Sequence, residues 1–237
     1  MLMALLHFPL SVWGQGVGEP VSRGVGNEYV VLLHGLSRSS RSMSTPAKRL
    51  SREGYTVVNV DYPSTEYAID HLSEVVLADA LRKCCSEAEV IHFVTHSLGG
   101  IVVRYYLEKH PLPNLGRVVM LSPPNQGSEL VDAFKDNLLY EVWNGPAGAE
   151  LGTDPQSVPS KLGPVAFELG VITGSTSLNP LLSRIIPGPD DGKVSVARAT
   201  VEGMKDFRVV PYSHTFIMDR RIVMDHVVHF LRMGTFR

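Results

Sequence analysis

The sequence predicts an α/β fold with a mostly parallel central sheet and helices on both faces of that sheet. Short apolar runs of strand length alternate with segments whose apolar residues recur every three or four positions. The run at residues 29–33 is unbroken, as expected for a parallel strand that is buried on both faces. A chain of 237 residues, of which 44% are hydrophobic, is sufficient for one such domain.

Helix-end signals and apolar runs give the order of these elements. Thr45-Pro46 provides a helix N-cap and a first-turn proline, and Gly54 ends that helix. The expected strands cover residues 29–33, 55–60, 90–94, 117–121, 167–172 and 207–210. The expected helices cover about 45–53, 67–82, 98–106 and 222–231. The last of them should place its apolar residues on one side: Ile222, Val223, Val227, Phe230 and Leu231. This alternation predicts βαβ units with right-handed crossovers.

The most informative segment is residues 93–100, which read Phe-Val-Thr-His-Ser-Leu-Gly-Gly. An apolar strand stops shortly before Ser97, two glycines come soon after it, and a helical pattern begins at once. A serine on such a turn is exposed, and the helix N-terminus favours negative charge beside it. Thr95 replaces the first glycine of the Gly-x-Ser-x-Gly pattern, so an ordinary strand-to-helix turn remains the alternative.

A nucleophilic serine requires a base, and the base requires an acid that fixes its tautomer. His214 and the pair Asp190-Asp191 lie in loops after expected strands, as Ser97 does. The carboxyl ends of parallel strands meet at one edge of a sheet, so we expect these side chains to lie close together. Asp191 is the favoured acid, Asp190 is the alternative, and Asp61 after an earlier strand is a weaker third candidate.

Location selects the base among the nine histidines. The side chain of His96, beside the nucleophile, should point away from that of Ser97 and support the turn. Six others belong to the N-terminal segment, a strand interior or helices: His7, His71, His92, His110, His226 and His229. His34 belongs to the turn that precedes Leu36, a candidate oxyanion donor. His214 therefore remains as the predicted base.

Acyl transfer also requires backbone N–H donors aimed at the oxyanion of the tetrahedral intermediate. The N–H of Leu98, directly after the serine, is one candidate. The N–H of Leu36, which follows His34-Gly35 at the end of the first strand, is the other. His34, Gly35 and Gly99 would then support the two turns. A strand-ending turn without a catalytic role is the alternative for His34-Gly35.

Two segments fall outside the alternation of strands and helices. Residues 124–165 are rich in Gly and Pro but contain large apolar side chains, which favours a cap or lid-like insertion over a binding site. Residues 1–28 precede the α/β domain of residues 29–237 and begin with an apolar run. That run fits either a degenerate export signal or a packed extension, so the sequence leaves open whether the protein is cytoplasmic or exported.

Composition excludes several classes of function. The formal net charge is −2 and no stretch is rich in Lys or Arg, so we expect no nucleic-acid partner. Cys84 and Cys85 are the only cysteines, and adjacent residues bridge only with strain, so we expect structural thiols and no disulfide framework. No Cys/His spacing indicates a zinc site.

Four motifs carry a further signal: Leu-Leu-His-Gly-Leu at 32–36, Thr-His-Ser-Leu-Gly-Gly at 95–100, Ser-Pro-Pro-Asn-Gln-Gly-Ser at 122–128 and Asp-Asp-Gly-Lys-Val-Ser-Val at 190–196. Together they make the chain resemble bacterial lipase/esterase-like α/β hydrolases. The resemblance implies the α/β-hydrolase fold, whose triad runs in the order Ser…Asp…His. In related lipases the aspartate before the glycine is the acid and a later histidine is the base, which supports Asp191 and His214. Thr95 is the departure from the pattern.

The resemblance implies a serine carboxylester hydrolase of esterase or lipase type that needs no cofactor. Its substrate would be a small-molecule or lipid ester, and the apolar content of residues 124–165 suits an acyl chain and peripheral contact with lipid or membrane. A thioesterase, amidase or acyltransferase would use the same triad and is the first alternative. A non-catalytic binding protein with this fold is the second. The sequence leaves the acyl-chain length and the oligomeric state open.

Overall fold

Six parallel strands form one sheet in the order β2-β1-β3-β4-β5-β6. The computed structural model describes residues 27–135 and 137–237, so His7 and nearly all of the predicted N-terminal segment lie outside the described residues. The strands are β1 Glu28–Leu33, β2 Thr56–Val60, β3 Val90–His96, β4 Leu115–Leu121, β5 Leu169–Gly174 and β6 Asp206–Val210. Each expected strand overlaps one of these, so the prediction of an α/β fold with a parallel sheet is confirmed.

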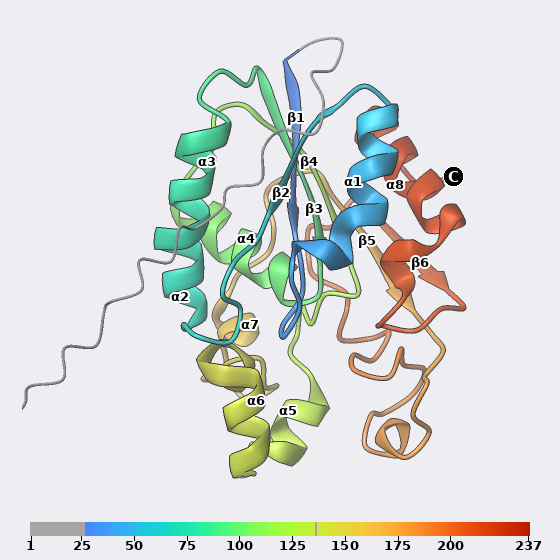
Figure 1. Cartoon of the computed structure of the whole chain (residues 1–237). Coiled ribbons are helices and arrows are strands. Elements are labelled where there is room, and N and C mark those ends of the chain that lie inside the picture. The colour runs from blue at the N-terminus through green and yellow to red at the C-terminus, as the bar shows by residue number, and fades with distance from the viewer. Residues whose placement is uncertain (1–26, 136) are drawn as a thin grey trace, which may run out of the picture.

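Helices cover both faces of the sheet, as predicted (Figure 1). Helices α1 and α8 pack on one face, whereas the segment from α2 to α3 and helix α4 pack on the other. These elements are α1 Ser44–Arg52, α2 Ile69–His71, a π-helical segment Leu72–Leu77, α3 Ala78–Cys84, α4 Leu98–Lys109 and α8 Arg221–Met233.

Strand β1 shows why its own apolar run is unbroken. Val30 and Leu32 belong to the core cluster that includes α8, while Val31 and Leu33 belong to the cluster that includes α4. Successive side chains of a strand point to opposite faces, so a strand covered on both sides must be apolar at every position. The apolar run of β1 therefore reflects its burial in the middle of the sheet, whereas the edge strand β6 is mostly half-exposed.

Strand order places a crevice beside β1. The chain passes from β1 to β2 on one side and then returns to place β3 on the other side of β1. The loops after β1 and β3 therefore leave their strands at the point where the strand order reverses, which is where open α/β sheets bind ligands.

Three short helices occupy the segment predicted to be an insertion: α5 Glu129–Phe134, α6 Leu138–Ala149 and α7 Val158–Lys161. They lie beyond the carboxyl ends of the strands, at the lower end of Figure 1. Gly145 has a φ of 61° and interrupts α6, and a Cβ there would come within 1.8 Å of the Thr65 carbonyl oxygen. The segment is also held at Glu150, whose carboxylate accepts a 2.7 Å hydrogen bond from the Ile69 N–H. Its action as a lid stays a prediction.

Two local expectations need correction. The single helix expected over residues 67–82 begins only at Ile69 and contains the π-helical segment, which apolar spacing does not distinguish from an α-helix. Ile222, expected on the apolar side of the last helix, is 50% exposed. The buried residues of α8 include Val223, Val227 and Phe230, and Ile222, which precedes Val223 by one residue, points about 100° away from it around the helix.

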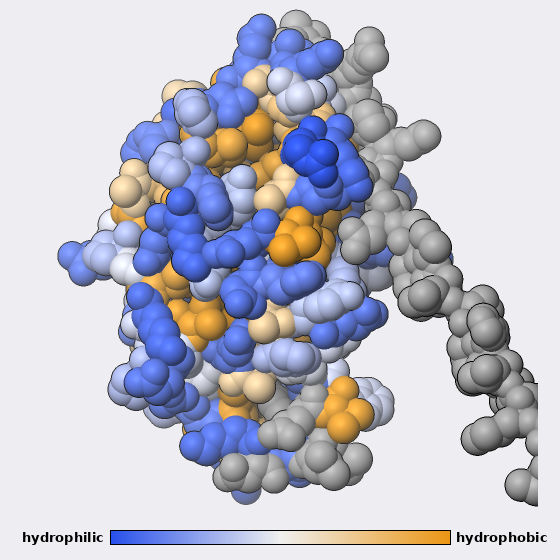
Figure 2. Space-filling model, turned by 90° about the vertical axis from the view of Figure 1, so that its left-hand side faces the viewer, coloured by the Kyte–Doolittle hydropathy of each residue, from blue (hydrophilic) through white to orange (hydrophobic). Residues whose placement is uncertain are grey.

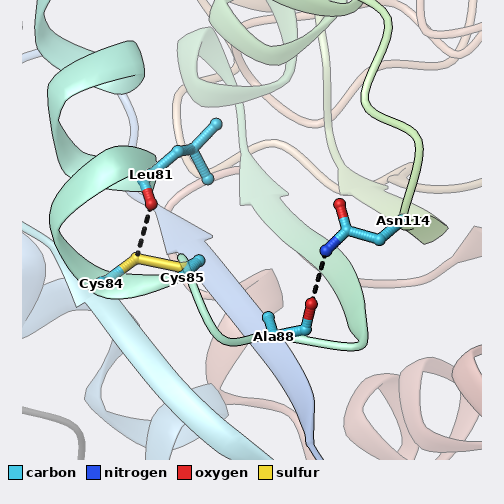
Figure 3. The surroundings of a disulfide bond; sticks show 5 residues. All are labelled: Leu81, Cys84, Cys85, Ala88 and Asn114. Carbon is cyan, nitrogen blue, oxygen red and sulfur yellow. Dashed lines mark hydrogen bonds between the residues drawn. A yellow bond between two sulfur atoms is a disulfide. The ribbon is translucent and has the colours of Figure 1, made fainter.

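Cys84 and Cys85 are joined by a disulfide at the end of α3 (Figure 3), so the expectation of free structural thiols is wrong. Cys85 follows the last residue of α3 and has left the helical backbone conformation, with φ −123° and ψ 17°. This change of direction brings the two neighbouring side chains together. A bond between adjacent residues links no distant parts of the chain, so it forms no disulfide framework.

The surface is mainly polar on the face that Figure 2 presents, with small hydrophobic patches between hydrophilic side chains. In residues 27–135 and 137–237, no helix is both long enough and apolar enough to cross a membrane.

Candidate active site

Ser97 stands at a sharp turn between β3 and α4. Its φ of 52° and ψ of −123° are unusual for a residue with a side chain, and its N–H donates a 2.9 Å hydrogen bond to the Leu121 carbonyl. A Cβ at Gly99 would lie 2.8 Å from the carbonyl oxygens of Leu33 and His34. Glycine at this position therefore allows the end of β1 to pass directly against the turn.

The loop after β1 lies against the same turn. A Cβ at Gly35 would come within 2.7 Å of the His96 ring and 3.1 Å of the Ser97 Cβ. The backbone of the Leu36 loop can reach the serine this closely because residue 35 has no side chain.

Thr95 occupies the first position of the motif without preventing the turn. The residue is fully buried, and its Oγ1 has no hydrogen-bond partner among the described residues. A Cβ at Gly100 would lie 3.2 Å from this Oγ1. The threonine side chain thus fits because Gly100, in α4, has no side chain. Gly100 lies one residue beyond the Gly-x-Ser-x-Gly pattern.

We expect Thr95→Val to raise the free energy of unfolding by about 1 kcal/mol, because it removes a buried hydroxyl without a partner and keeps the shape of the side chain. Chemical denaturation monitored by circular dichroism measures this change. Thr45→Val, at a threonine whose hydroxyl donates a 2.8 Å hydrogen bond to Asp219, is the matched control and should not stabilise the protein. A loss of stability in Thr95→Val would contradict the argument.

Asp191 and His214 form a buried pair in the loops after β5 and β6. Asp191 Oδ2 lies 2.9 Å from His214 Nδ1, and the side chains are almost fully buried. Asp191 Oδ1 accepts backbone hydrogen bonds from Lys193 at 3.0 Å and Val194 at 2.9 Å. Burial alone would raise the pKa of the Asp191 carboxyl, but the charge and hydrogen bond of His214 hold this pKa below its ordinary value. Asp191 is therefore ionised at neutral pH and fixes the orientation of the His214 ring.

The other two candidate acids have different partners. Asp190 Oδ1 accepts hydrogen bonds from the Ser183 hydroxyl at 2.9 Å and the Gly192 N–H at 2.7 Å, so this carboxylate organises its own loop. Asp61 accepts a 2.7 Å hydrogen bond from the Ser40 N–H and lies 3.6 Å from His34. Of the three candidate acids, the structure brings Asp191 to His214.

His34 ties the ends of β1 and β2 together. Its Nδ1 lies 2.9 Å from the Gly35 carbonyl oxygen, its Nε2 accepts the Tyr62 N–H at 3.2 Å, and its ring stacks on Tyr62. Burial lowers the pKa of His34, so the neutral ring donates through Nδ1 and accepts through Nε2. This arrangement is consistent with the supporting role predicted for His34.

His96 supports more than its own turn. Its Nε2 lies 2.9 Å from the carbonyl oxygen of His214, and the two rings are 4.8 Å apart. Burial, followed by the charge of His214, lowers the pKa of His96 well below its ordinary value. A neutral His96 can donate this hydrogen bond and hold the His214 loop against the end of β3.

A cavity of about 320 Å³ connects these groups. Ser97 and His214 line it together with Leu36, the residue predicted to supply one oxyanion donor. Much of the apolar lining comes from the insertion, through Leu130, Val131, Phe134 and Leu151. Residues of the insertion thus supply part of the cavity lining, while a cap over a binding site stays a prediction.

Arg38 and Lys193 also line this cavity, and the sequence reasoning missed both. Each stands two residues after a predicted site residue, Leu36 in the first case and Asp191 in the second. Lys193 lies within the motif at 190–196 and Arg38 lies two residues beyond the motif at 32–36, which was the signal that could have drawn attention to them. Neither belongs to a recognised catalytic pattern.

A larger concavity of about 700 Å³ lies at the opposite edge of the sheet, near the starts of β1, β3 and β4. Its lining includes Glu28, His92 and Arg117 but none of the predicted catalytic residues. Among the residues that the structure describes, no group of three or more His, Cys, Asp or Glu side chains could hold a metal ion. The cavity at Ser97 is therefore the candidate site.

Solved structures of lipases share this architecture at low sequence identity. The mature form of Bacillus licheniformis lipase BlEst2 superposes with a TM-score of 0.67 at 19% identity, covering 94% of this chain and 96% of that chain. Legionella pneumophila phospholipase PlaB gives a TM-score of 0.65 at 17% identity, covering 89% of this chain and 60% of that chain. Aspergillus fumigatus lipase B gives a TM-score of 0.69 at 16% identity, covering 91% of this chain and 56% of that chain. At these identities the similarity concerns the fold.

Comparison of the sequence with proteins of curated function gives no match. The sequence profile of the alpha/beta hydrolase family, by contrast, matches residues 30–219. This span runs from β1 through the loop of His214 and includes every residue of the candidate site. Because the profile covers most of the chain, the protein belongs to the alpha/beta hydrolase family.

Proposed function

We propose that the protein is a serine carboxylester hydrolase of esterase or lipase type. The observation that carries the proposal is the orientation of His214. Its Nδ1 is held by the buried Asp191 carboxylate, which leaves Nε2 available to act in the cavity that Ser97 also lines. A base in this tautomer is the requirement for activating a serine hydroxyl.

The reaction proceeds through an acyl-enzyme intermediate. His214 Nε2 takes the proton of Ser97 Oγ as this oxygen attacks the ester carbonyl carbon. The tetrahedral intermediate collapses, and the leaving alkoxide receives that proton from His214. Water then attacks the acyl-enzyme with His214 again as the base, which releases the acid and restores the Ser97 hydroxyl. Asp191 stays ionised and stabilises the positively charged His214 in both steps.

Two backbone N–H groups would bind the oxyanion. Leu98 is the first residue of α4, where N–H groups have no acceptor within the helix, and it directly follows Ser97. Leu36 lines the cavity in the loop that Gly35 allows to approach the serine. The positive end of the α4 dipole adds to this stabilisation.

The apolar part of the cavity suits an acyl chain. Leu130, Val131, Phe134 and Leu151 provide this surface from the insertion, and Trp143 in α6 is 75% exposed. Val142, Leu178 and Leu181 are also exposed apolar residues of α6 and the loop after β5. These side chains support a peripheral contact with lipid when the ester is a lipid.

A panel of p-nitrophenyl esters of increasing acyl length, compared with thioesters and amides, tests the proposal. We expect ester turnover at neutral pH, with kcat/KM rising with chain length until the apolar lining is filled. Long-chain esters presented in micelles test the lipid contact in the same panel. Preferential turnover of thioesters or amides would favour the alternative acyl-transfer enzymes. No turnover by the wild type, together with no labelling by a fluorophosphonate, would favour the non-catalytic alternative.

A further inference from the structure

Two cationic side chains share one part of the candidate site. Arg38 comes from the loop after β1 and Lys193 from the loop that contains Asp191, and both line the cavity of Ser97. They act on each other and on His96: the charges of both cations contribute to lowering the pKa of His96. Arg38 bonds the carbonyl oxygen of Thr215 and His96 bonds that of His214, so Arg38 lies on the His96 side of the cavity, whereas much of the apolar lining comes from the insertion.

Neither cation is neutralised by an ion pair within the described part of the chain. Arg38 Nη2 donates a 3.1 Å hydrogen bond to the Thr215 carbonyl, and no carboxylate oxygen of a described residue lies within 4 Å of the guanidinium. Burial lowers the pKa of the Arg38 guanidinium, and the charge of the nearby Asp219 offsets only part of this effect. The fixed guanidinium thus keeps N–H groups that have no protein acceptor among the described residues.

Lys193 has no protein partner for its ammonium group among the described residues. The two oxygens of Asp191, the carboxylate nearest in the chain, already accept bonds from His214 and from backbone N–H groups. Desolvation and then the charge of Arg38 lower the pKa of Lys193, and Asp191 opposes them. The Lys193 side chain is exposed to solvent while it lines the cavity, so its ammonium group is open to an anionic ligand that enters the site.

We propose that Arg38 and Lys193 form an anion-binding subsite, and that the preferred substrate is an ester carrying a carboxylate or phosphate group on its acyl or alcohol part. This inference rests on the proposed ester hydrolysis and names its substrate class. The anionic group binds the two cations while an apolar portion of the ester lies against Leu130, Val131 and Phe134. The ester carbonyl is then placed between them at Ser97.

Binding to a protein that cannot turn the ester over tests the subsite separately from catalysis. In a Ser97→Ala background, isothermal titration would compare monoethyl adipate with ethyl hexanoate, in which a methyl group replaces the carboxylate. We expect the adipate ester to bind about tenfold more tightly, a difference typical of one hydrogen-bonded ionic contact. The second pair, glycerol monobutyrate with and without a phosphate on the glycerol, tests an anion on the alcohol side.

Lys193→Met in the same background removes the charge and keeps the length of the side chain. We expect it to abolish most of the preference for the anionic ester. Lys48→Met, at an exposed lysine of α1 outside the cavity, is the matched control and should keep the preference. Arg38→Met is the secondary variant, because Arg38 also holds the loop of His214 through Thr215.

The outcomes separate the two proposals. Equal binding of the charged and neutral members in both pairs overturns the subsite, as does a preference that persists in both Lys193→Met and Arg38→Met. Neither result affects the hydrolysis of neutral esters by the wild type, which tests the proposed function. Failure of wild-type turnover overturns ester hydrolysis, while the binding preference and its loss in Lys193→Met still decide the subsite.

Discussion

Replacing Ser97 with alanine is expected to reduce kcat for a p-nitrophenyl ester by about five to six orders of magnitude. The reason is that the acyl-enzyme cannot form without Oγ, whereas the cavity and the oxyanion donors remain. The His214→Ala change should cause a loss of similar size, since His214 is the base that the Asp191 carboxylate holds. The double variant should be no less active than either single variant, because the two side chains act as one unit.

Steady-state kinetics measures these losses, and circular dichroism checks that each variant folds. Ser37→Ala is the matched control: Ser37 also has a positive φ, 54°, and its hydroxyl donates to the Trp143 carbonyl. This variant should keep kcat within a few-fold of the wild type. Activity of Ser97→Ala above about one per cent of the wild type, or undiminished labelling of that variant by a fluorophosphonate, would show that another residue is the nucleophile.

The fold could be predicted because a buried parallel sheet leaves a strong signal in sequence. Strands covered on both faces must be apolar at consecutive positions, as Val30 and Val31 illustrate from opposite core clusters. Strand ends could be located for the same reason, since the apolar run stops where the polar residues of the site begin. The π-helical segment within residues 67–82 could not, because helix periodicity is nearly the same in both forms.

The part of the site that follows strand ends was also predictable, whereas the cations were not. Asp191 and His214 follow β5 and β6 along the chain, so topology alone predicts that they meet near Ser97. Arg38 and Lys193 enter the cavity through long side chains on irregular loops, and the direction of such side chains depends on tertiary packing. The Cys84–Cys85 disulfide depended on a local change of backbone direction at Cys85, which the sequence reasoning did not include.

Asp191→Asn is expected to reduce kcat by about four orders of magnitude while leaving ester binding almost unchanged. An asparagine can still accept the Lys193 and Val194 N–H groups through its oxygen, so the loop should keep its shape. Its amide, however, would donate to His214 Nδ1 and place the ring proton on Nε2, where the base must accept a proton. The kinetic signature is therefore a large fall in kcat with little change in KM.

Asp190→Asn is the matched control for this change, because Asp190 is adjacent and buried but accepts hydrogen bonds from Ser183 and Gly192 instead of His214. Its kcat should stay within about tenfold of the wild type, and a larger loss there than in Asp191→Asn would make Asp190 the acid.

Unfolding at different pH values supplies an independent test. The folded state lowers the pKa of Asp191, so its ionised form stabilises the fold above about pH 4, and this stabilisation is lost as the pH falls through the lowered pKa. The difference in unfolding free energy between wild type and Asp191→Asn should therefore be constant near neutral pH and shrink in acid.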